Sequence, residues 1–256
     1  MSKRIGLFDM KHIHSPNLPS SRVTVAAVGH QYERVIAALE GVGISCIKLD
    51  ACDRLPPAVQ YHADMLLHHL GGRELLIHNE HTKDAQELMK YGFSVAAISQ
   101  PLGATYPFDC TLNVLRLGNR IICGRNPAPE ITRYCENKGI EQLMCAQGYA
   151  RCSVCVVSDN AIITTDPSIA AICKQEGIDV LKISAGHIRL DGYPYGFIGG
   201  CCGLIDKGVL AFTGVLERHP DSEIMLDFLQ KYNVKHINLT DGELLDIGGI
   251  LPLACE

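Results

Sequence analysis

The sequence contains no stretch that approaches the roughly 20 consecutive apolar residues that a membrane-spanning helix needs. It also lacks an apolar signal segment behind Lys3 and Arg4, because Asp9, Lys11 and His12 interrupt the run. Basic residues are not in excess, since 23 Lys and Arg stand against 28 Asp and Glu, giving a net charge of -5. These absences argue against a membrane or a nucleic-acid partner and predict a soluble, cytoplasmic protein.

The cysteines do not have the spacing of a zinc knuckle. Cys152 and Cys155 form a lone C-x-x-C pair, which is a weak signal. Most of the 12 cysteines fall inside apolar runs, where a reduced cysteine packs as a small hydrophobic residue. Without an export signal, reduced thiols are the better interpretation than a disulfide scaffold. We therefore expect no disulfides, no structural zinc and no cofactor.

What the sequence does contain is a repeated order of hydrophobic periodicities, in which two strand patterns precede one helix pattern. The second repeat is the clearest, with a hairpin turn at Gly71-Gly72 and a helix that ends at Gly92, the residue type favoured at a left-handed C-cap. Its predicted elements are strands at 62–70, 74–78 and 94–98 and a helix at 82–91.

The same order recurs in the third, fourth and fifth repeats. The third has predicted strands at 110–117, 120–124 and 141–145 and a helix at 129–138. The fourth has strands at 152–157, 161–164 and 179–183, and its helix begins with Asp166-Pro167, a capping residue followed by a favoured first residue. The fifth has strands at 202–205, 209–213 and 235–239 and a helix at 221–232. The predicted helix-ending residues are Gly43, Gly92, Gly139, Gly177 and Asn233.

The first repeat lacks one strand, since it offers only strands at 22–28 and 44–49 around a helix at 31–40. The apolar run at 247–253 has no partner of its own and can supply the missing strand. Pairing the two chain ends closes a ring and removes free sheet edges. The pattern thus predicts one α/β domain over residues 1–256, a five-bladed propeller of ββαβ repeats. The alternative is an open α/β sheet, which has one strand before each helix rather than two.

This repeat order resembles the pentein propeller, the fold of guanidino-group-modifying enzymes such as arginine deiminase, agmatine deiminase, amidinotransferases and dimethylarginine dimethylaminohydrolase. Local motifs are most similar to those of an uncharacterised bacterial family described only as having that fold. The motifs that carry the resemblance are Tyr61-His62-Ala63-Asp64, Tyr106-Pro107-Phe108-Asp109, the stretch at 147–153, the stretch at 192–200 and Leu245-Asp246-Ile247-Gly248-Gly249. The resemblance covers nearly the whole chain.

The resemblance implies an active site at the mouth of a central channel lined by the first strand of each unit. Asp64 stands where the family has the carboxylate that grips the guanidinium, although Ala63 occupies a place where a second acid is common. His187 stands at the place of the family histidine. The family cysteine would fall near Leu253, so Cys255, two residues later, is one candidate for the nucleophile.

The chemistry of guanidinium hydrolysis points to a second candidate. It needs a thiolate to attack a resonance-stabilised carbon, carboxylates to hold the cation, and a histidine to move protons. Cys152 begins an inner strand and follows Arg151, whose charge would lower the pKa of the thiol. Cys110, Cys201 and Cys202 begin inner strands too, and each of these cysteines has the alternative of simple packing.

Because the starts of the inner strands converge on the axis of a ring, we expect Asp64 and His187 to share one pocket. Asp109, Asn113 and Arg151 should lie nearby and bind the substrate together with Asp64, and Cys152 should lie beside them as a candidate nucleophile.

A metal site is the competing interpretation of several residues. The candidates are His12, His14, His62, Asp64, His68, His69, His78 and His81. Strand alternation sends His68 and His69 to opposite faces, so that one site cannot easily use both. We therefore predict no metal.

The leading functional hypothesis is a cofactor-free, cysteine-dependent hydrolase, deiminase or amidinotransferase that acts on a small guanidino or amidino compound. The alternative is a non-catalytic pentein that serves as a binding or assembly module, because a fold alone does not decide function. A homodimer is compatible with both hypotheses. A cysteine close to Asp64 and His187 would favour the enzyme.

Overall fold

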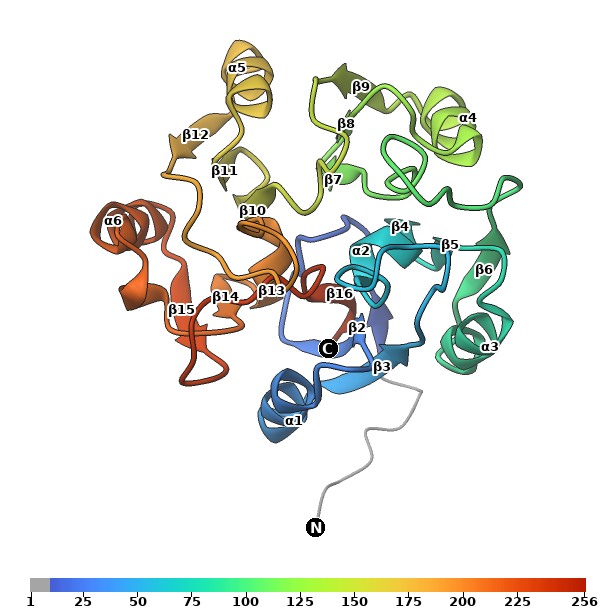
Figure 1. Ribbon diagram of the computed structural model, residues 1–256, viewed down its shortest axis with the longest axis horizontal. Coiled ribbons are helices and arrows are strands. Elements are labelled where there is room, and N and C mark those ends of the chain that lie inside the picture. The colour runs from blue at the N-terminus through green and yellow to red at the C-terminus, as the bar shows by residue number, and fades with distance from the viewer. Residues whose placement is uncertain (1–9) are drawn as a thin grey trace.

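A computed structural model describes residues 10–256, and residues 1–9, on which part of the export-signal expectation depends, lie outside the described part. Figure 1 shows five small sheets arranged around a common axis, with one longer helix on the outside of each. The helices are α1 (Glu33–Gly41), α2 (Ala63–Leu66), α3 (Thr82–Lys90), α4 (Pro129–Lys138), α5 (Pro167–Gln175) and α6 (Ser222–Lys231).

Four of the sheets have three strands each, in the order of the chain. They are β4 (Leu67–Gly71), β5 (Glu74–Ile77) and β6 (Ser94–Ala97); β7 (Leu115–Leu117), β8 (Arg120–Cys123) and β9 (Glu141–Met144); β10 (Val154–Ser158), β11 (Ala161–Thr164) and β12 (Asp179–Lys182); and β13 (Cys202–Asp206), β14 (Val209–Phe212) and β15 (Lys235–Asn238). In every one, the first two strands are antiparallel and the third returns parallel to the second after the outer helix. The predicted ββαβ unit is therefore present in the second to fifth repeats.

The first sheet joins the two ends of the chain. β16 (Leu251–Cys255) lies between the two-residue strand β1 (Lys11–His12) and β2 (Val23–Gly29), and β2 continues to β3 (Ser45–Leu49). β16 runs antiparallel to β2, so it takes the place of the missing first strand. It begins at Leu251 rather than at residue 247, because Gly248 and Gly249 both have a φ of 75°, which is incompatible with an extended strand. That residues 1–256 form a single domain stays a prediction.

The predicted helix ends are confirmed. All five expected ending residues have positive φ, a conformation that favours Gly and, less often, Asn. Asp166 caps α5 as expected, because its side chain accepts hydrogen bonds from the backbone N–H groups of Ser168 and Ile169 at 2.8 and 2.9 Å.

The inner strands of the second, third and fourth units begin later than predicted because a turn precedes each of them, whereas β13 begins at Cys202 as expected. The strand expected from His62 begins at Leu67 after α2, and the one expected from Cys110 begins at Leu115. In the first case the Met65 N–H donates to the carbonyl of His62 at 3.0 Å. These turns satisfy buried backbone groups locally where the units converge and no neighbouring strand is available. They also carry the polar residues of the axis.

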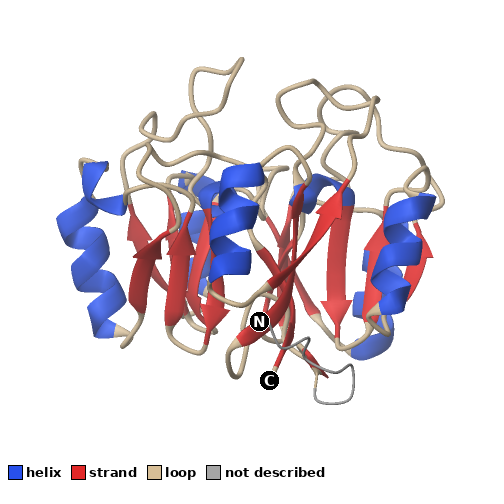
Figure 2. Ribbon diagram, turned by 90° about the horizontal axis from the view of Figure 1, so that it is seen from below, coloured by secondary structure: helices blue, strands red, loops and turns tan. Residues whose placement is uncertain are grey.

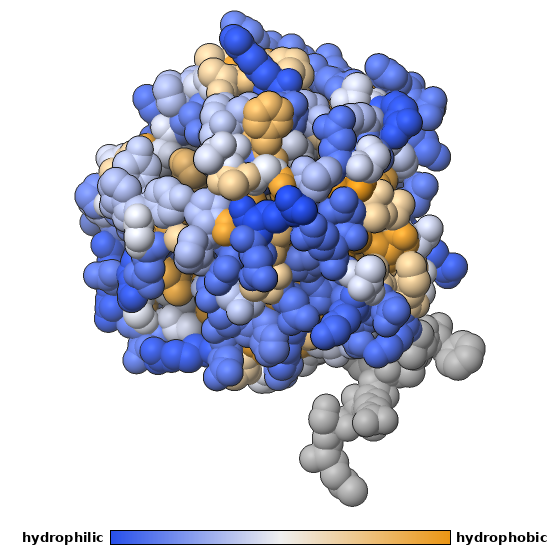
Figure 3. Space-filling model, turned by 45° about the vertical axis from the view of Figure 1, so that its right-hand side comes forward, coloured by the Kyte–Doolittle hydropathy of each residue, from blue (hydrophilic) through white to orange (hydrophobic). Residues whose placement is uncertain are grey.

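The strands run along the axis, long loops gather at one end of the ring, and the C-terminus lies at the other (Figure 2). Three clusters of buried apolar side chains fill the space between sheets and helices and cross the unit boundaries. The face drawn in Figure 3 is mostly hydrophilic, with apolar side chains in small separate groups. Within residues 10–256, no helix has both the length and the apolar character required to cross a membrane.

Candidate functional site

The turns before the inner strands bring Asp64, Asn113 and Cys152 into contact on the axis of the ring. Cys152 Sγ donates to Asp64 Oδ2 at 2.9 Å, and Asn113 Nδ2 donates to Cys152 Sγ at 3.0 Å. The three residues come from the second, third and fourth units and are almost fully buried. The sequence-based expectation that they lie together is thus what the structure shows.

Asn113 holds both the backbone and the sulfur of Cys152 by hydrogen bonds. Its Oδ1 accepts hydrogen bonds from the backbone N–H groups of Arg151 and Cys152 at 2.9 and 3.1 Å. Its Nδ2 also lies 3.3 Å from the carbonyl oxygen of Asp64. One amide side chain therefore joins the turns of three units.

Arg151 places a guanidinium in the buried interior beside Asp64. Its Nε donates to Asn17 Oδ1 at 3.0 Å, and a terminal nitrogen donates to the carbonyl of Gly199 at 3.1 Å. Burial raises the pKa of Asp64 to about 7, with Arg151 acting in the opposite direction and Asp246 adding to the rise. Asp64 is therefore a carboxyl group that changes charge near neutral pH.

Sequence reasoning did not assign a site role to His62 or Asp246, which complete the cluster. His62 Nδ1 lies 3.7 Å from Asp246 Oδ1, and both side chains are 1% exposed. His62, Asp64 and Cys152 each offer a ligand-type atom within 4.8 Å of the others. The spacing His62-x-Asp64 was the available signal, but it was assigned to a strand, whereas α2 begins between the two residues.

Two glycines of the local motifs are required by crowding around this cluster. A Cβ at Gly200 would lie 1.8 Å from Asp246 Oδ1, and a Cβ at Gly248 would lie 2.4 Å from the Cα of His62. Asp246 cannot easily move away, since it accepts from the backbone N–H groups of Phe197 and Gly248 at 2.8 and 3.0 Å. Any side chain at these glycines would displace the acid or the histidine.

The thiol of Cys152 is not activated in the way the sequence suggested. Burial, the carboxylates of Asp64 and Asp246, and the hydrogen bond to Asp64 raise its pKa well above the ordinary value. The expectation that Arg151 lowers this pKa is wrong, because the Arg151 side chain turns toward Asn17 and Gly199 and the carboxylate of Asp64 contacts the sulfur instead.

His187 and Cys255 do not join the axis cluster. His187 is exposed, and its ring packs edge-on against His219 with 5.4 Å between ring centroids. Within residues 10–256, no hydrogen bond joins it to Asp64, Cys152 or Cys255. Cys255 ends β16 near the C-terminal end of the ring, in a buried apolar cluster that includes Val23.

The remaining predicted residues have separate partners. Asp109 Oδ2 accepts from the Tyr149 hydroxyl at 2.7 Å, and burial raises the pKa of the adjacent Cys110 to about 12. The thiols of Cys201 and Cys202 each donate to the carbonyl of Ile198 at 3.2 Å, which is typical of packing residues.

A cavity of about 20 Å³ lies beside the cluster, lined by Asp64, Arg151, Asn17 and the start of β16. Such a volume holds about one water molecule. A substrate therefore fits beside Asp64 only if residues that line this cavity, such as Asn17 or Arg151, move away.

Residues 27–251 match the family described as "Family of unknown function (DUF6873)". The chain belongs to this family. No curated protein matches the DUF6873 chain.

Solved structures that resemble the DUF6873 chain share its fold at low sequence identity. A DDAH from Pseudomonas aeruginosa complexed with citrulline is 9% identical, with a TM-score of 0.56 over 92% of this chain and 99% of that chain. The agmatine deiminase of C. jejuni is 12% identical, with a TM-score of 0.53 over 90% of each chain. An inosamine-phosphate amidinotransferase from Streptomyces griseus is 10% identical, with a TM-score of 0.53 over 94% of this chain and 96% of that chain. The pentein resemblance and the five-unit α/β propeller are thereby confirmed.

Proposed function

We propose that this protein acts on a small guanidino or amidino compound at the ring axis, with Cys152 as the nucleophile. The observation that carries the proposal is the 2.9 Å contact between Cys152 Sγ and Asp64 Oδ2. A carboxylate to hold the cation and a thiol to attack its central carbon are the two groups that such a substrate requires. The names of the structural neighbours, a DDAH, an agmatine deiminase and amidinotransferases, support the general class.

In the proposed reaction, Cys152 Sγ forms a bond to the guanidino carbon while the thiol proton passes to Asp64. A pKa of about 7 suits Asp64 to this role at neutral pH. The C–N bond then breaks, and the departing amine takes the proton from Asp64. Water next attacks the carbon held by sulfur and gives one proton to His62. The C–S bond then breaks, the departing thiolate takes the second proton of the water, and a urea product leaves. An acceptor amine in place of water would give amidino transfer.

We assign to His62 the activation of this water, which is one part of the role that the sequence gave to His187. Burial lowers the pKa of His62, with Asp246 acting in the opposite direction, which favours the neutral ring that can accept a proton. Asp246 Oδ1 lies 3.7 Å from His62 Nδ1, so its carboxylate would stabilise the ring when it carries a proton.

The second candidate function is a non-catalytic binding module, and a specific observation favours it. Arg151 already places a guanidinium beside Asp64, and the raised pKa keeps Cys152 protonated at neutral pH. In that case the axis cluster holds the five units together rather than turning over a substrate.

Labelling with 2-chloroacetamidine separates the two functions, because its cationic amidine mimics a guanidinium. The matched control reagent is neutral 2-chloroacetamide. The enzyme proposal expects the amidine to modify Cys152 at least 10-fold faster than the amide does, as carboxylate recognition of a cation would require. Labelling is followed on the Cys152 peptide by mass spectrometry, so that modification of Cys52 is counted apart. Asp64→Asn should abolish the preference at Cys152, whereas His187→Ala should not change it. Equal labelling by both reagents, or a preference that survives Asp64→Asn, would favour the binding module.

A further inference from the structure

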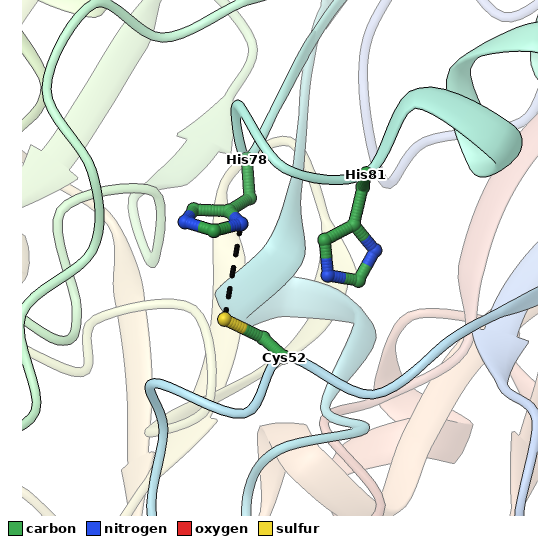
Figure 4. A group of neighbouring side chains, drawn as sticks. All are labelled: Cys52, His78 and His81. Atoms are coloured by element: carbon green, nitrogen blue, oxygen red, sulfur yellow. Dashed lines mark hydrogen bonds between the residues drawn. The ribbon is translucent and has the colours of Figure 1, made fainter.

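A second cluster of buried cysteine and histidine lies outside the axis site, at the junction of the first and second units. Cys52 follows β3, whereas His78 and His81 lie between β5 and α3 (Figure 4). Cys52 Sγ lies 3.8 Å from His78 Nδ1. One potential ligand atom from each of the three residues lies within 4.8 Å of the other two. From these residues we propose that Cys52, His78 and His81 bind a zinc ion.

The distances are close to those of tetrahedral zinc. Bonds of about 2.3 Å to sulfur and about 2.0 Å to nitrogen place the sulfur and nitrogen ligands about 3.6 Å apart. The 3.8 Å between Cys52 and His78 already fits, and the upper limit of 4.8 Å for the other pairs asks only for small side-chain rotations. Three protein ligands leave the fourth position of the ion for water or a small ligand.

The orientation of His81 is that of a metal ligand. Its Nδ1 lies 2.5 Å from Asp84 Oδ2, and Figure 4 shows its other ring nitrogen turned toward Cys52 and His78. Metal-binding histidines commonly donate their second N–H to a carboxylate in this way. Asp84 is itself held by the backbone N–H of Asp50 at 3.1 Å.

The cluster has few other contacts that would explain it. His78 is fully buried, and its Nε2 has no hydrogen-bond partner within residues 10–256, so Cys52 is the polar partner of this ring. A cysteine thiolate and neutral imidazole nitrogens are ligands that zinc prefers, and the cluster offers one of the first and two of the second.

The axis cluster fits a cation less well, although His62, Asp64 and Cys152 are equally close. The Arg151 guanidinium acts on Asp64 there and would repel a metal ion. Near Cys52, Arg54 is already paired with Glu80 at 2.7 Å. The zinc proposal therefore contradicts the sequence-based expectation of no metal, and it does not depend on the proposed function.

The test is a cobalt titration of the reduced, chelator-treated full chain, in which Co²⁺ reports a tetrahedral sulfur-containing site by its absorption. We expect one Co²⁺ per chain, with sulfur-to-cobalt charge-transfer and tetrahedral visible bands that zinc removes by competition. Cys52→Ala should weaken zinc binding at least 100-fold, and Asp84→Asn should weaken it about 10- to 100-fold because it only orients His81. The matched control is Cys46→Ala, which removes a cysteine of β3, the strand that precedes Cys52. This variant should bind zinc as tightly as the wild type does.

Three results would overturn the proposal. The first is the absence of the cobalt absorption bands in the wild-type protein. The second is a loss of the bands in Cys152→Ala while Cys52→Ala keeps them, which would assign the ion to the axis cluster. Where Cys52→Ala does not fold, the wild-type protein still decides, since zinc should slow alkylation of Cys52 by iodoacetamide at least 10-fold. Unchanged alkylation of Cys52 at saturating zinc would be the third.

Discussion

The two buried cysteine clusters shift the pKa of their thiols in opposite directions. On the axis, burial and the carboxylates of Asp64 and Asp246 raise the pKa of Cys152. At the junction of the first two units, burial acts in the same direction, but hydrogen bonds from His78 and His81 lower the pKa of Cys52 to about 6. Both residues are almost closed to solvent, at 3% and 2% exposed, although Cys152 lies deeper in the protein. Carboxylates act on one thiol and imidazoles on the other, so the neighbours shift the two pKa values in opposite directions.

Ring closure should affect both clusters at once, and its loss has the largest expected effect. Deleting residues 251–256 removes β16, which pairs with β1 and β2 and packs next to the axis. We expect the truncated chain to lose its cooperative thermal transition, as measured by circular dichroism. An unchanged melting temperature would contradict closure, and separate melting of one region would contradict a single domain.

Replacement of Arg151 tests whether the axis cluster depends on its buried cation. Arg151→Met removes the charge beside Asp64 and leaves the Gly199 carbonyl and the Asn17 side chain without their donor. Leaving each of these two acceptors without its donor should cost about 1–3 kcal/mol of unfolding free energy, measured by urea denaturation. The control Arg189→Met removes an exposed arginine paired with Asp191 and should leave stability close to that of the wild type. Equal losses of stability in the two variants would show that the buried contacts of Arg151 contribute no more to stability than those of an exposed arginine.

Thiol reactivity compares the two clusters directly. At pH 7.5 in the presence of a chelator, Cys52 should react with neutral iodoacetamide about 100-fold faster than Cys152, because only the thiolate is nucleophilic. Peptide mass spectrometry of samples quenched over time gives both rates in one experiment. Cys46, whose pKa burial raises to about 12, is the slow internal control. Faster modification of Cys152 than of Cys52 would reverse the comparison.

The pH dependence of stability should report Asp64. Its pKa is raised to about 7 in the folded chain from an ordinary value of 3.8, so the folded state binds a proton more tightly. The resulting stability is present at acidic pH and is lost as pH rises through 7. Relative to wild type, Asp64→Asn should therefore gain stability between pH 4 and 7, by at most about 1.4 kcal/mol per pH unit.

Urea denaturation at several pH values measures this difference. Asp227→Asn on α6 is the control, because this carboxylate is exposed to solvent, unlike that of Asp64. A constant difference between Asp64→Asn and wild type across this pH range would mean that Asp64 keeps an ordinary pKa.

Local chemistry explains which parts of the fold were predictable. The predicted boundaries of α4 and β11 agree with the structure, because Pro129, Gly139 and a tight turn mark them in the sequence. The starts of most inner strands were predicted too early, since buried residues such as Ala63–Leu66 were assigned to a strand but form a helical turn at the axis. Periodicity cannot distinguish the two over four residues.

The candidate site was predictable only in part. Asp64 and Cys152 were expected to converge because they stand near the starts of equivalent repeats, and Asn113 was expected nearby. The expected partner His187 lies elsewhere, because its place on a loop does not follow from the repeat. Asp246 belongs to one of the local motifs, but the sequence did not predict its role. Its proximity to His62 joins two segments that lie far apart in the chain.

The sequence by itself determined the repeat, the turns and the helix ends, since these depend on residues that are neighbours in the chain. Only the tertiary structure decided which cysteines face carboxylates and which face imidazoles. Cys152 meets Asp64 across 88 positions, and Cys52 meets His78 across 26. No local pattern encodes such pairs, because the packing of one repeat against another brings them together, and they set the charge of each thiol.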